Sequence, residues 1–142
     1  MTLKVVQITK INEDDFKFVD IENLTFPIPP LSSVNFYKNE EGEKTLKICA
    51  TLYINSLESK APTFGSLTQN KNGTAEIYFK YIWDRYSPDT YDVWYVEIDY
   101  TAENVEDITE VTSYLQYTVP PLDGGVGEDP TLSRGTKTSA KD

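Results

Sequence analysis

Hydrophobic and polar side chains alternate along much of this chain, with the period of two that indicates β-strands buried on one face. In residues 45–55 every second side chain is apolar: Leu46, Ile48, Ala50, Leu52 and Ile54. Residues 75–83, 92–101 and 111–119 repeat the pattern. The alternation therefore predicts four strands in the middle and later parts of the chain.

The first third of the chain predicts three more strands, over residues 3–9, 15–21 and 34–38. The prolines within residues 26–31 exclude a central strand there and indicate an edge segment or a crossover. One short helical segment is expected over residues 102–109. About seven strands at this spacing predict an all-β fold, an antiparallel β-sandwich of the Ig-like or jelly-roll-like kind.

The character of the chain changes after Leu122. Residues 123–142 are rich in Gly and in polar or charged side chains, and they offer little apolar surface for burial. We therefore predict one β-sandwich domain over residues 1–122. Residues 123–142 are expected to form an extended, flexible polar tail that is ordered only by a partner.

The charge of the chain narrows the choice of partners. It has 23 acidic and 13 basic residues, which gives a net charge of −10. Such a surface repels phosphate backbones and anionic headgroups, so we expect neither nucleic acid nor a membrane as a partner. The first residues become polar too soon for a signal peptide, which predicts synthesis in the cytoplasm without one.

Histidine and cysteine, on which many catalytic and metal sites depend, are absent or nearly so. The chain has no histidine, which excludes Ser-His-Asp and Cys-His catalysis and His-ligated zinc. Its one cysteine, Cys49, is interpreted as a small packing residue. The acidic residues of the loops lack EF-hand spacing and are interpreted as solvated turn carboxylates. We therefore predict a protein that is not an enzyme and holds neither a metal nor a cofactor.

The tyrosines carry more information, because four of them lie on the polar faces of the four clearest strands. Tyrosine combines apolar area with a hydroxyl group and is enriched at protein interfaces. Cross-strand tyrosines also stabilise sheets that bind nothing, and a two-sheet fold would divide the four between two outer faces. The partner-binding residues we predict are Tyr53, Tyr78, Tyr95 and Tyr114 on the strands, with Leu122, Val126 and Leu132 in the tail.

A second aromatic group surrounds the loop that follows residue 82. The alternative ligand-binding residues are Trp83, Tyr86 and Tyr91, with Asp84 and Asp89 beside them. Aromatic rings of this kind stack on sugars, and the two carboxylates would bind a sugar directly or through calcium. Trp83 also fits the inward alternation of its strand, so a place at the lid of the core competes with this interpretation.

Two hypotheses about function follow. The first is a non-enzymatic structural or assembly protein that docks onto larger protein neighbours, in homo- or hetero-oligomers. Its concrete form is a component of a phage or virus particle, such as a capsid, neck or tail accessory protein. The alternative is a β-sandwich module that binds carbohydrate or another ligand. Both need only a stable scaffold and a surface, so the fold alone does not choose between them.

Overall fold

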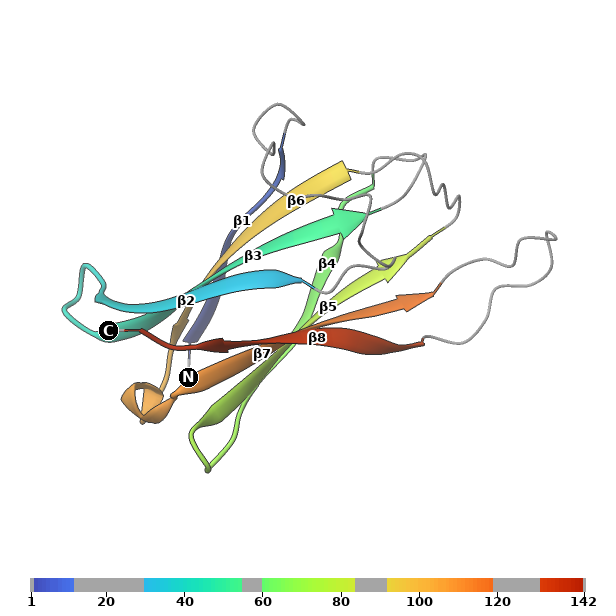
Figure 1. The fold of residues 1–142 in the computed structure, drawn as a ribbon. Coiled ribbons are helices and arrows are strands. Elements are labelled where there is room, and N and C mark those ends of the chain that lie inside the picture. Colours follow the sequence, from blue (N-terminus) through green and yellow to red (C-terminus); the bar gives the residue numbers. More distant parts are fainter. Residues whose placement is uncertain (1, 12–29, 55–59, 84–91, 119–130, 142) are drawn as a thin grey trace, which may run out of the picture.

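The structure, a computed structural model, describes residues 2–11, 30–54, 60–83, 92–118 and 131–141. These residues form an all-β protein with eight strands and one short 3-10 helix (Figure 1). The strands are β1 (Thr2–Ile11), β2 (Leu31–Lys38), β3 (Lys44–Ile54), β4 (Thr63–Gln69), β5 (Thr74–Ile82), β6 (Asp92–Thr101), β7 (Glu110–Thr118) and β8 (Thr131–Ser139). The all-β prediction is confirmed, with one strand more than the seven expected.

The strands form two sheets of four, in the orders β1-β6-β3-β2 and β4-β5-β7-β8. Each pair of neighbours is antiparallel except β5 and β7, which are parallel. The prediction of a purely antiparallel arrangement is therefore wrong for the second sheet. The reason lies in the connections: between β5 and β7 the chain crosses to the first sheet as β6 and returns, and two reversals restore its direction.

The core contains the inward side chains of both sheets, as the alternation predicts. Leu46, Ile48, Ala50, Leu52 and Ile54 of β3 are all buried, and the alternate residues of β5, β6 and β7 join them in one hydrophobic cluster. Hydrogen bonds between side chains also link the two sheets. The Ser32 and Ser113 hydroxyl oxygens lie 2.6 Å apart, and the Tyr100 hydroxyl donates to the Gln69 Oε1 at 3.0 Å.

Strand β4 was not predicted, because a bulge interrupts its alternation. The pairing of β4 with β5 shifts between Phe64 and Ser66. As a result the two apolar residues, Phe64 and Leu67, are three positions apart and yet both pack against the core. Gly65 occupies the bulge, where a Cβ atom would lie 2.9 Å from the Tyr78 carbonyl oxygen. The close backbone approach explains why glycine stands at this position.

Strand β8 differs from the prediction of a polar tail. Thr131–Ser139 pairs with β7 along the edge of the second sheet, so this part of the segment is ordered by the chain itself. Most of its residues are polar, and backbone hydrogen bonding, which the alternation of side chains does not report, places it in the sheet. Lys141 continues to the first sheet, where its N–H donates to the Val34 carbonyl oxygen and its C=O accepts from the Phe36 N–H.

Two further predictions concern short elements. The segment expected to be helical contains only the 3-10 turn η3 (Val105–Asp107), which begins after Asn104 in a left-handed conformation. No helix within the described residues is long and apolar enough to cross a membrane. The strand predicted over residues 15–21 lies outside the described residues.

Candidate functional site on the outer face of the second sheet

Two of the four predicted tyrosines meet on the outer face of the second sheet. Tyr78 of β5 pairs with Tyr114 of β7, and their rings are stacked with centroids 4.7 Å apart and planes inclined by 10°. The register places Ser66 of β4 beside Tyr78 and Gly135 of β8 beside Tyr114. A row of four residues, small–Tyr–Tyr–small, therefore runs across all four strands. We call it the tyrosine row.

Gly135 determines how the Tyr114 ring lies. A Cβ atom at Gly135 would be 2.8 Å from Cε1 and 2.9 Å from Cδ1 of the Tyr114 ring. The ring therefore lies against the backbone of the edge strand, in the space that a side chain at Gly135 would occupy, while Gly135 itself stays exposed. With Tyr78 on its other side, the Tyr114 ring is held between two surfaces.

Hydrogen bonds fix the other end of the row. The Tyr78 hydroxyl donates to Glu76 Oε2 at 2.7 Å, and the Asn70 side chain donates to Glu76 Oε1 at 3.2 Å. The bond to Glu76, followed by burial and the negative charge of the carboxylate, raises the pKa of Tyr78 to about 12. Both rings are half-buried. The row is therefore an aromatic surface with fixed side-chain orientation.

The other two predicted tyrosines lie in the first sheet. Tyr95 is half-buried on its outer face, and its hydroxyl donates to Glu97 Oε1 at 3.1 Å. Hydrogen bonding to Cys49 and burial raise the pKa of Tyr95. Tyr53 is only 1% exposed, so its prediction as a surface contact is wrong. Its cross-strand neighbour Val93 is buried as well, which means that this end of the outer face is covered.

The structure adds residues that the alternation does not single out. On the outer face of the first sheet, the Lys47 ammonium lies 5.2 Å from the centroid of the Tyr37 ring. Burial, a hydrogen bond to Asp99 and the nearby charges raise the pKa of Tyr37 to about 12. Tyr37 is thus tied to charged neighbours of its own sheet.

Three residues of the predicted tail were also expected to contact a partner. Leu132 lies in β8, whereas Leu122 and Val126 are outside the described residues. Of the alternative ligand site, only Trp83 is described, and it is 2% exposed and packed edge-on against Tyr81 and Tyr117. Trp83 is therefore part of the core and not a platform for a sugar. Asp84, Tyr86, Asp89 and Tyr91 lie outside the described residues.

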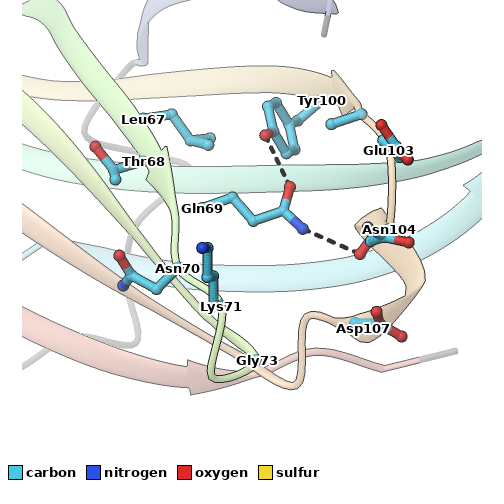
Figure 2. A pocket seen from close by; sticks show the side chains of 11 residues that line it. Leu67, Thr68, Gln69, Asn70, Lys71, Gly73, Tyr100, Glu103, Asn104 and Asp107 are labelled. Carbon is cyan, nitrogen blue, oxygen red and sulfur yellow. Dashed lines mark hydrogen bonds between the residues drawn. The ribbon is translucent and has the colours of Figure 1, made fainter.

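A hollow of about 740 Å³ opens at one end of the sheets, between the β4–β5 turn and η3 (Figure 2). Gln69 crosses it, accepting from the Tyr100 hydroxyl at 3.0 Å and donating to the Asn104 carbonyl at 3.0 Å. Asn70 is also engaged, with Thr74 Oγ1 and Glu76. The side chains of Gln69 and Asn70 are thus hydrogen-bonded within the protein, and Gln69 forms a structural bridge.

A second hollow, of about 540 Å³, adjoins the β2–β3 turn and is lined by Glu40, Glu41, Glu43 and Asp99 among others. Across the ranges described, no three His, Cys, Asp or Glu side chains are grouped so as to hold a metal ion. Cys49 is half-buried beside Tyr95 and Glu97, which agrees with its interpretation as a packing residue. The tyrosine row is therefore the feature that we take as the candidate site.

Comparison with known proteins adds no assignment: no family description, no curated protein and no solved structure matches this chain.

Proposed function

We propose that this protein is a non-enzymatic structural subunit that docks onto protein neighbours, including copies of itself, through the outer face of its second sheet. The concrete form of the proposal is a component of a phage or virus particle. The observation that carries it is the stacked pair Tyr78–Tyr114, held by Gly135 on one side and by Glu76 on the other.

Docking at an interface has an entropic cost. Ordering a free, rotamer-rich side chain at an interface costs about 0.5–1.5 kcal/mol. Stacking and the bond to Glu76 already restrict the Tyr78 and Tyr114 rings, so a partner gains contact with aromatic surface at a smaller entropic cost. Tyrosine, with tryptophan and arginine, is enriched among the residues that dominate binding at protein interfaces.

We also propose that the two sheets pack face to face as a β-sandwich of the Ig-like or jelly-roll-like class. The support is the single hydrophobic cluster that draws on both sheets, together with the inter-sheet bonds Ser32–Ser113 and Tyr100–Gln69. Such a scaffold would present the tyrosine row on a rigid surface, since the opposite side of the same strands carries the core.

The docking proposal is tested by light scattering after size-exclusion chromatography over a range of concentrations. The wild type is expected to form discrete oligomers, and the double variant Tyr78→Ala, Tyr114→Ala to dissociate at least about tenfold more readily. Tyr37→Ala is the matched control, because it removes a half-buried tyrosine from the outer face of the other sheet. A wild type that stays monomeric throughout, or equal loss in the control, would overturn the proposal.

The alternative function, a carbohydrate-binding or calcium-assisted ligand module, finds no supporting contact within the described residues. It is tested with the same preparation. If tryptophan fluorescence responds to oligosaccharides and the response is abolished by Tyr86→Ala, the ligand module would replace the assembly proposal.

A further inference from the structure

The C-terminal arm, which we define as Thr131–Lys141, contributes little to the core through the side chains that the structure describes. None of its described side chains is buried, and Lys137 and Ser139 are exposed. Its side-chain contacts include an ion pair of Lys137 with Glu110 at 3.5 Å, in which Lys137 is 70% exposed, and a hydrogen bond from Thr138 to the Ser32 carbonyl at 3.3 Å. Exposed ion pairs contribute little. Among the described contacts, backbone pairing with β7 is therefore the main attachment of the arm.

The strand that pairs with the arm has core contacts and a second partner strand of its own. Val111, Ser113 and Leu115 of β7 face the core, and β7 pairs with β5 along its whole length. An arm taken away from β7 would leave a row of backbone N–H and C=O groups open, which is a template for another strand. The folded body would thus keep its core while offering a vacant edge.

Tyr114 makes that edge selective. Its ring occupies the space where any side chain opposite it would begin, and Gly135 fits because it has no Cβ atom. A strand that replaces the arm in the same register therefore needs glycine at this position, four residues after its first paired residue. The arm of another copy of the chain meets this requirement.

The length of the connection permits such an exchange. Antiparallel neighbours are joined by as few as two to five residues, but residues 119–130 separate β7 from β8. A segment of this length spans up to about 40 Å when extended. The arm also contacts both sheets, because Lys141 bonds β2 beyond the end of β8. A donated arm would thus join the two sheets of its acceptor in the same way.

We propose that two copies of this chain exchange their C-terminal arms, so that β8 of one copy pairs with β7 of the other. The inference rests on the proposed function. An exchanged arm makes the same contacts as an arm paired with β7 of its own chain, so exchange needs additional binding free energy from docking at the tyrosine row. A tethered arm competes at an effective concentration in about the millimolar range. Exchanged arms therefore predominate in the docked oligomer, whereas in dilute protein each arm stays paired with β7 of its own chain.

The register supplies a direct test by disulfide trapping. The Ala140 N–H donates to the Thr109 carbonyl, which makes Thr109 and Ala140 a hydrogen-bonded pair. Hydrogen-bonded and non-hydrogen-bonded pairs alternate along an antiparallel ladder, so the pair Thr112–Lys137 on the outer surface is non-hydrogen-bonded. The short distance between the Cα atoms of such a pair is compatible with a disulfide. The test variant is Thr112→Cys, Lys137→Cys in a Cys49→Ser background.

A matched control uses a hairpin that is too short to exchange. Lys38 and Lys44 face each other across the β2–β3 turn, next to the hydrogen-bonded pair Asn39–Glu43. The variant Lys38→Cys, Lys44→Cys, also in the Cys49→Ser background, is expected to form only intrachain disulfides. Both variants are refolded at low and at high concentration, oxidised, denatured and separated on non-reducing gels, with light scattering before denaturation.

We expect the Thr112–Lys137 pair to give intrachain bonds in dilute protein and interchain bonds in the oligomer, with an interchain fraction rising about tenfold or more over the concentration series. Oligomers that contain only intrachain bonds would overturn arm exchange and leave docking at the tyrosine row standing. Monomers with only intrachain bonds at every concentration would overturn both proposals. Interchain bonds of equal amount in the control would show random oxidation and also overturn exchange.

Discussion

Replacing Gly135 with alanine tests the packing of the tyrosine row most sharply. The new Cβ atom would lie 2.8 Å and 2.9 Å from two carbons of the Tyr114 ring and 3.2 Å from the Ser113 carbonyl oxygen. Either the ring leaves its stack with Tyr78 or β8 moves away from β7. Overpacking of this kind costs about 1–3 kcal/mol, and the lost stack accounts for about 0.5–1.5 kcal/mol of that cost.

Replacing a glycine also has a stabilising effect on the free energy of unfolding, which opposes the cost of the clash. Alanine reduces the conformational freedom of the unfolded chain and stabilises a protein by about 0.4–1 kcal/mol where the backbone tolerates it. Gly135 is not among the residues with positive φ, so the backbone itself accepts alanine. The net expectation is a loss of about 1–2 kcal/mol in the free energy of unfolding for Gly135→Ala.

The decisive comparison is with a chain from which the ring has been removed. In a Tyr114→Ala background the clash with the ring disappears, so Gly135→Ala is expected to be neutral or to stabilise by up to about 1 kcal/mol. The coupling energy of the double-mutant cycle is then about 1–3 kcal/mol. Urea unfolding monitored by circular dichroism, with equal m-values, measures it. Equal effects of Gly135→Ala in both backgrounds would refute the close contact between Tyr114 and Gly135.

Three further predictions address other parts of the structure. Gln69→Ala removes the bridge between Tyr100 and Asn104 and should lower the free energy of unfolding by about 1–3 kcal/mol in urea unfolding, whereas a change below about 0.5 kcal/mol would contradict the bridge. The pKa of Tyr78 is raised to about 12, so its neutral phenol stabilises the fold fully below pH 10, and this contribution is lost as the pH rises towards 12. Glu76→Gln should bring the phenolate absorbance transition of Tyr78 back towards pH 10. An unchanged titration would argue against the hydrogen bond between Tyr78 and Glu76. Both tryptophans, Trp83 and Trp94, are buried, so iodide should quench the fluorescence of the native protein far less than that of the unfolded chain, and strong native quenching would contradict their placement.

The sequence predicted the central strands well because burial on one face leaves a period-two pattern. β6 was predicted with the bounds that the structure has, and β3, β5 and β7 within one residue at each end. The alternation also assigned the inward residues of β3 correctly. Where a strand contributes a full row of side chains to the core, its pattern alone is sufficient.

The failures have identifiable physical causes. A bulge at Gly65 moves the apolar residues of β4 out of alternation, and β8 is an edge strand attached through its backbone. Parallel pairing of β5 and β7 depends on the path of the chain between sheets, which local pattern does not encode. Tyr53 and its cross-strand neighbour Val93 are both buried on the outer side of their sheet, a tertiary effect that alternation does not reveal.

The candidate site was predictable only in part. The polar-face positions of Tyr78 and Tyr114 followed from alternation, but their meeting depends on the pairing of β5 with β7. Gly135 carried no signal, because its role arises from the ring opposite it in the folded sheet. A glycine within a polar segment reads as a loop until its cross-strand neighbour is known.

The most direct test of docking at the tyrosine row is the molar mass of the full chain in solution, set beside that of the Tyr78→Ala, Tyr114→Ala variant. A discrete oligomer for the wild type and a smaller, still folded species for the variant is the predicted result. A monomeric wild type, or a variant that keeps the same mass as the wild type, would contradict docking through this surface.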